Sequence, residues 1–174
     1  MKKKNSLELV LSAAAILGAA TALWLAVPIT PLQAAGEPIV VIVNAANPVD
    51  NLSLGELKKL FMSDRSKWDT GKSVAPVMVA AGAPERTAFL KIVCGMNDGD
   101  FSKYFLQAAF TGKSATPPKE VGGTSAAKSF VANSAGAIGF VKAGDFHGEG
   151  SDGGVKSVKV DGVAAADAGY KLRM

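Results

Sequence analysis

A continuous apolar run near residue 40 constrains the fold more than any other feature of the sequence. Residues 38–43 read Pro-Ile-Val-Val-Ile-Val. Successive β-branched side chains with no polar alternation are typical of a strand buried on both faces. Such a strand needs other elements on each side of it. The chain that follows alternates strand-like and helix-like segments, and this order predicts an α/β domain.

The expected elements can be placed along the chain. Ser53 and Glu56 have the spacing of a capping box, which predicts a helix that starts at this point. Residues 110–122 are rich in turn-forming residues, and we expect a loop there. The remaining expected elements are a strand over residues 74–80, a helix opened by Pro84, a helix capped by Asp100, a helix over residues 124–133, and strands over residues 137–141 and 155–160.

The scarcity of cysteine and histidine excludes several kinds of site. One Cys and one His rule out an intramolecular disulfide, a cysteine-rich zinc site and a histidine cluster. His147 lies in a glycine-rich loop with Asp145, Glu149 and Asp152, where solvation explains the charges without a metal. No Ser-His-Asp arrangement is credible with this lone His. We expect a protein that is not an enzyme and that holds neither metal nor cofactor, with Cys94 buried.

Residues 1–35 have the organisation of a secretory signal peptide. Three lysines at positions 2–4 precede an uncharged run from Leu9 to Val27, and prolines and small residues follow. Cleavage after Ala34 or Ala35 would leave residues 36–174 as one exported, periplasmic domain. The alternative is an uncleaved anchor, because the run approaches the roughly 20 residues that span a bilayer. The domain would then be held at the inner membrane and face the periplasm.

The charge of the chain gives little support to a nucleic-acid partner. The whole chain has a net charge of +4, and residues 1–35 contribute three Lys and one Glu, so the remainder carries only +2. Residues 36–174 contain no long basic stripe of the kind that follows a phosphate backbone. We expect no nucleic-acid binding, and membrane contact only through the leader.

Three segments share patterns with one known family. Residues 52–61 read LSLGELKKLF and are followed by Trp68, residues 134–141 read SAGAIGFV, and residues 155–172 contain the pattern V-x-x-V-x-V-x-G ending in Gly-Tyr-Lys-Leu. In this order they resemble the substrate-binding proteins of phosphate ABC transporters. The similarity covers nearly all of residues 38–174 and no single motif decides it.

The resemblance implies a single domain like one lobe of a type 2 periplasmic binding protein, with a mixed sheet flanked by helices. Family members enclose their ligand between two lobes, which are joined by two crossover strands. In this chain the similarity begins at the first crossover, residues 40–44, and ends at the second, residues 170–174. It therefore implies one lobe and half of a cleft.

Two functions are compatible with a single lobe. The first is an exported solute-binding module that binds phosphate or another small anion weakly, because half a cleft supplies few contacts. A second copy or another exported protein would then close the half-cleft. The alternative is an accessory or interaction protein that kept the lobe and lost ligand binding.

The anion site that the resemblance implies departs from the family pattern. The family places Arg after the strand and Ser-Gly-Thr at the helix start, and this chain has Ala80 and Pro84-Glu85-Arg86. Pro84 has no N–H to donate, and Glu85 adds a negative charge. The remaining candidate anion ligands at this helix start are Gly82, Ala83, Arg86 and Thr87. The competing interpretation is that Glu85 neutralises the helix end and Arg86 is solvated.

A second candidate lies at Gly122-Gly123-Thr124-Ser125, where a glycine pair opens another expected helix. The hydroxyls of Thr124 and Ser125 would either contact an anion or cap the helix. A glycine pair without further motif residues is a weak signal of a ligand site.

Overall fold

The structure is a computed structural model that describes residues 36–148 and 153–174. The expected signal peptide, and the loop residues Glu149 and Asp152, lie outside these ranges. Within them no helix is long and apolar enough to cross a membrane.

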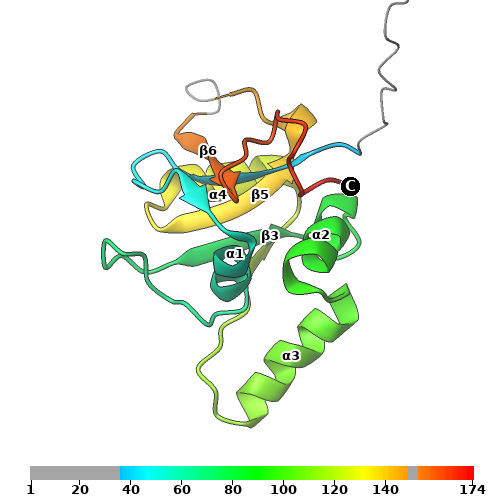
Figure 1. The fold of residues 1–174 in the computed structure, drawn as a ribbon. Coiled ribbons are helices and arrows are strands. Elements are labelled where there is room, and N and C mark those ends of the chain that lie inside the picture. Colours follow the sequence, from blue (N-terminus) through cyan, green and yellow to red (C-terminus); the bar gives the residue numbers. More distant parts are fainter. Residues whose placement is uncertain (1–35, 149–152) are drawn as a thin grey trace, which may run out of the picture. The chain divides into compact units, whose positions relative to one another are not determined.

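The described residues form a mixed six-stranded sheet and four α-helices (Figure 1). The strands are β1 (Ile39–Asn44), β2 (Asn51–Leu52), β3 (Ala75–Val79), β4 (Lys119–Val121), β5 (Ala137–Lys142) and β6 (Val155–Val160). The helices are α1 (Leu54–Phe61), α2 (Pro84–Phe89), α3 (Asp98–Phe110) and α4 (Thr124–Asn133). A π-helical turn, Leu90–Cys94, continues α2, and a 3₁₀ turn, Ala143–Asp145, follows β5.

The sheet has the strand order β2-β6-β1-β5-β3-β4. β1 is antiparallel to both β5 and β6, whereas β3 is parallel to β4 and β5, and β2 is parallel to β6. This arrangement confirms the expected α/β domain with a mixed sheet flanked by helices. The strand predicted from the apolar run is β1, and all six of its residues are buried.

The alternate residues of β1 enter two different cores. Ile39, Val41 and Val43 pack with apolar side chains of α1, α2 and α3 on one face of the sheet. Val40 and Ile42 pack on the other face, where α4 covers β1, β3 and β5. The absence of polar alternation in this run is explained, because neither face of β1 contacts solvent.

The capping box predicted from Ser53 and Glu56 is present. The Ser53 hydroxyl accepts a hydrogen bond from the Glu56 N–H at 3.2 Å, and the Glu56 carboxylate accepts one from the Ser53 N–H at 2.8 Å. The capping box therefore sets where α1 begins, and this places Phe61 at its other end against the sheet. Phe61 contacts Phe89 of α2, with ring centroids 4.7 Å apart, and Phe89 stacks on Phe140 of β5 at 4.0 Å.

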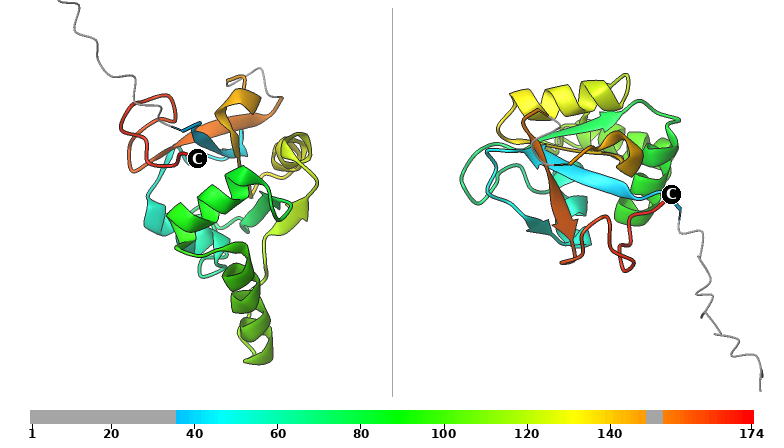
Figure 2. Two further views of the ribbon diagram at one scale, coloured as in Figure 1. Left: turned by 90° about the vertical axis from the view of Figure 1, so that its right-hand side faces the viewer. Right: turned by 90° about the horizontal axis from the view of Figure 1, so that it is seen from above.

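Two local predictions were wrong, and one short strand was not expected. Asn97, not Asp100, caps α3, and its side chain accepts a hydrogen bond from the Asp100 N–H. Residues 119–121 form β4 instead of a loop, and residues 51–52 form β2. Both strands are short and carry polar residues, so only their pairing with β3 and β6 identifies them. α3 extends away from the sheet (Figure 2). Leu106 and Phe110 near its end are exposed.

Gly136 is expected to be essential for stability because its backbone lies against the loop before β3. A Cβ atom at Gly136 would lie 2.0 Å from the carbonyl oxygen of Ser73. The Gly136 carbonyl also accepts the indole N–H of Trp68 at 2.9 Å. Gly136→Ala should lower the free energy of unfolding by about 2 kcal/mol, measured by urea denaturation. The control is Gly122→Ala, whose Cβ would have no atom within 4 Å; equal losses would contradict the prediction.

The contribution of Cys94 to the free energy of unfolding should decrease as the pH rises in the alkaline range. Its side chain is buried, as expected, and burial raises the pKa of the Cys94 thiol from 9.0 to about 11. Between these values the unfolded chain ionises and the folded chain does not, so the thiol's contribution is complete below pH 9 and falls as pH rises toward 11. The stability difference between the wild type and Cys94→Ala should therefore narrow over this range. A difference that stays constant would contradict this account.

Candidate functional site

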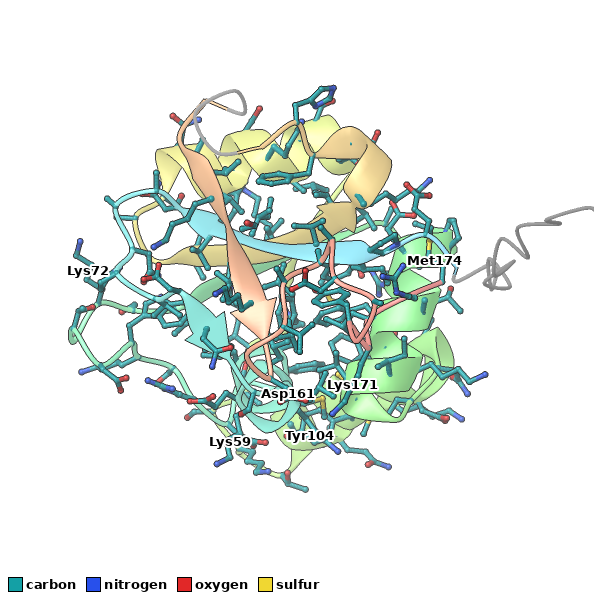
Figure 3. The ribbon with its side chains drawn as sticks, turned by 45° about the horizontal axis from the view of Figure 1, so that its top comes forward. Lys59, Lys72, Tyr104, Asp161, Lys171 and Met174 are labelled. Atoms are coloured by element: carbon teal, nitrogen blue, oxygen red, sulfur yellow. The ribbon has the colours of Figure 1, made fainter. Side chains whose placement is uncertain are left out.

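The start of α2 lies beside both ends of the described domain. The Met174 N–H donates to the Glu37 carbonyl at 3.0 Å, and the Arg173 guanidinium donates to the Gly36 carbonyl at 3.3 Å. Figure 3 shows Met174 against α2. We call the surface at this place the α2 face. It holds an open hollow of ≈ 670 Å³, lined by Pro84, Thr87, Ala88, Ile92 and Met174 with Lys91 and Arg173.

Arg86, the expected anion ligand, is hydrogen-bonded to groups of the protein itself. Its side chain is 2% exposed. The Nε atom donates to Asp98 at 2.6 Å, and Nη1 donates to Glu120 at 2.6 Å and to the Val79 carbonyl at 2.9 Å. The guanidinium thus joins β3, α2, β4 and the start of α3. The interpretation in which Arg86 is solvated is wrong, and its assignment as an anion ligand stays a prediction.

Glu85 brings a negative charge to the same helix start. Its side chain is buried, its Oε2 atom has no hydrogen-bond partner, and the Lys142 Nζ lies 3.7 Å away. Ala83 is the N-cap and offers no side chain, and Pro84 at the first position has no N–H. A carboxylate therefore occupies the positive end of the α2 dipole, where an anion would otherwise be favoured.

The other candidate residues of this helix start are open to solvent or make local contacts. Gly82 is exposed and has a left-handed φ of +88°, and Ala83 is half-buried. Thr87 is exposed, and its hydroxyl donates to the Ala83 carbonyl at 3.2 Å. Thr87 lines the hollow of the α2 face together with Lys91 and Arg173, whereas Gly82 and Ala83 do not line it.

The second candidate site has a different local structure from the one expected. Gly123 caps α4 without a side-chain hydrogen bond, so neither hydroxyl acts as the cap. Thr124 instead contacts the Asp145 carboxylate at 3.1 Å, and Ser125 is exposed. The parallel pairing of Val79 with Val121 places the starts of α2 and α4 at the same edge of the sheet. The sequence predicted candidate anion ligands at both helix starts, and the strand pairing places the two starts near each other.

Besides Glu85, this edge of the sheet carries the carboxylates of Asp98, Glu120 and Asp145, and the sequence did not indicate that these acids lie together. Asp98 and Glu120 are paired with Arg86, Glu85 faces Lys142, and Asp145 contacts Thr124. No short motif marks these acids, because they come from four separate elements and one of those strands was expected to be a loop. Three of these carboxylates face cations of the protein itself, Arg86 and Lys142. Among the described residues, no group of three or more His, Cys, Asp or Glu could hold a metal ion.

Comparison with known proteins places the fold. No protein-family model and no curated protein matches the sequence. A solved phosphate ABC transporter substrate-binding protein from Clostridium perfringens, with bound phosphate, is 26% identical with a TM-score of 0.59. The match covers 75% of this chain and 48% of that one. The chain has the fold of one lobe of such a protein.

Two further solved structures agree with this assignment of fold. An ABC-type phosphate transport receptor from Vibrio cholerae is 21% identical, with a TM-score of 0.59 and coverage of 75% of this chain and 49% of that one. PstS from Borrelia burgdorferi is 9% identical at the same TM-score, over 74% of this chain and 49% of that one. The chain spans about half the length of these structures, as the expected single lobe requires.

Removal of Arg86 should destabilise the domain. Arg86→Ala would leave Asp98 and Glu120 without their shared cation, and we expect a loss of about 3 kcal/mol in the free energy of unfolding. The lower end of the usual range applies because both carboxylates retain some exposure. Arg65→Ala is the matched control, since Arg65 also pairs with two carboxylates, those of Asp69 and Glu56, but both are exposed and should contribute under ~1 kcal/mol. Similar losses for the two variants in urea denaturation would contradict the prediction.

Proposed function

We propose that this protein is an exported, solute-binding-protein-like module that acts by docking another exported protein on its α2 face, and that it does not hold phosphate by itself. The observation that carries the proposal is the state of Arg86, whose charge is buried and shared by two carboxylates. A lobe that retained phosphate binding would need a free donor at this position. We therefore propose a role in binding another protein, and not in binding phosphate.

The position of the α2 face supports a docking role. The solved structures that match this chain are about twice its matched length. Both ends of the described domain meet at the α2 face, and the open hollow there is lined by apolar atoms of Pro84, Ala88, Ile92 and Met174. An apolar concave surface beside charged groups is typical of a site for another molecule.

The rim charges favour one kind of partner. Lys91 is exposed, and among the described residues no carboxylate lies within 4.0 Å of Lys91 or Arg173. In the described part of the chain, the Arg173 guanidinium donates only to backbone carbonyls, those of Tyr170, Gly36 and Asp167. The face therefore fits an apolar side chain flanked by carboxylates. A second copy of this chain would bring the same cations together, which disfavours it as the occupant.

Weak binding of phosphate or another small anion is the second candidate function. It is favoured by the bound phosphate in the structure from Clostridium perfringens, which is 26% identical to this chain. In either case we propose a periplasmic protein, or one held at the inner membrane by its leader, that is not an enzyme.

Calorimetric titration of residues 36–174 with phosphate, and with sulfate as control, separates the two functions. We expect no saturable heat with phosphate up to about 10 mM, because the only buried cation at the helix start already has two carboxylate partners. Saturable phosphate binding that is absent with sulfate, and is weakened by Thr87→Ala, would contradict the main proposal and support the second candidate.

Docking can be tested with a photo-crosslinking amino acid at Ala88, in cells that export the protein. We expect one adduct of defined mass, and we expect it to disappear when Lys91 and Arg173 are both changed to Glu. The same amino acid at Lys72, on the opposite side of the domain, is the control (Figure 3). An adduct of twice the chain's mass would identify a second copy instead. No adduct at Ala88, or an equal one at Lys72, would contradict docking at this face.

A further inference from the structure

A second hollow, of ≈ 380 Å³, lies at the other end of β3. The α2 face follows the last residues of β3, whereas this hollow surrounds Ala75 at its beginning and Lys119 at the beginning of β4. Figure 3 shows the two regions apart, with Lys72 in the loop before β3 and Met174 beside α2. The volume falls within the range of small-molecule sites. We call it the hydroxyl hollow.

Five hydroxyl groups surround this hollow, and most of them are free to contact a ligand. They belong to Ser63, Ser66, Ser73, Ser114 and Thr116. The Ser63 hydroxyl donates to the Thr116 carbonyl and so ties the turn after α1 to the segment before β4. The hydroxyls of the other four residues have no hydrogen-bond partner among the described residues. Each can both donate and accept a hydrogen bond.

The charged side chains of the hydroxyl hollow are all cationic. Arg65, Lys67 and Lys119 line it, and none of its lining residues is acidic. Arg65 is engaged by Asp69 at 2.5 Å and by Glu56 at 3.7 Å. Among the described residues, no carboxylate lies within 4.0 Å of Lys67 or Lys119. These two lysines therefore provide a positive potential that the protein itself does not cancel.

Lys119 is held in place by an aromatic ring. Its Nζ atom lies 4.5 Å from the centroid of the Phe130 ring, within the range of a cation–π contact. Phe130 is half-buried and lines the hollow with Leu60, Val74 and Pro76. The hollow thus has apolar atoms beside its hydroxyls and cations. Inorganic phosphate alone would be too small to cover these atoms.

We propose that the hydroxyl hollow binds a small organic anion that carries several hydroxyl groups, the chemistry shared by sugar phosphates and sugar acids. The anionic group would be attracted by Lys67 and Lys119, and the ligand hydroxyls would pair with the serines and Thr116. The apolar faces of a sugar ring would contact Phe130 and Pro76. This proposal uses none of the residues of the α2 face, and it stands or fails independently of the docking role.

The test measures binding to residues 36–174 by calorimetry, with glucose 6-phosphate and glucuronate as the two anionic probes. Uncharged glucose and inorganic phosphate are the ligand controls. We expect saturable binding of at least one anionic probe, tighter than that of glucose and of phosphate. The double change Lys67→Glu and Lys119→Glu should weaken it about tenfold or more, because two attractive charges become repulsive.

The matched control is Lys103→Glu combined with Lys159→Glu, which changes the net charge equally at exposed positions outside the hollow. This variant should bind the probe as the wild type does. Circular dichroism verifies that both double variants are folded, and Ser114→Ala, a smaller change, should also weaken binding. No saturation by either anion up to about 10 mM would overturn the proposal. Equally tight binding of glucose, or equal weakening by the control variant, would overturn it as well.

Discussion

β1 is buried on both faces of the sheet, and the need to cover its side chains places most other parts of the domain. Ile39, Val41 and Val43 require apolar partners on one side, which α1 and α2 provide, and Val40 and Ile42 require α4 on the other. The two antiparallel neighbours, β5 and β6, satisfy its backbone groups along nearly the whole strand. Burial of this kind is the main favourable contribution to folding in a domain of this size.

The ion cluster around Arg86 helps to position β4, the outer strand of the sheet, which is not paired with β1. β4 has only three residues, two of them exposed, and apolar packing contributes little to its position. The backbone pairing with β3 positions it, the bond from Arg86 to Glu120 adds to this, and the bond from Arg86 to Asp98 holds the start of α3. The same cluster explains why a lobe can resemble a phosphate-binding protein and still present no free cation at the helix start. The Arg86 guanidinium at this helix start is paired within the protein itself.

The sequence was informative wherever one local pattern determined the structure. The β-branched run of β1, the Ser53–Glu56 capping box and the start of α2 at Pro84 all follow from residues close together in the chain. β2 and β4 could not be predicted in this way, because two or three polar residues become a strand only when a distant neighbour pairs with them. The partners of Arg86 were missed for the same reason, since Asp98 and Glu120 are separated from it by 12 and 34 residues. The signal peptide and the anion ligands stay predictions.

The adjacency of residues 37 and 174 has a consequence for how this lobe can be connected to other polypeptides. Backbone groups at the two positions are joined by a hydrogen bond of 3.0 Å, so chain entering the lobe and chain leaving it would occupy one point on its surface. A lobe of this kind can be interrupted, rejoined by a short linker, or placed within a loop of another protein without disturbing either core. Its two ends would act as a single attachment point on the surface of the lobe.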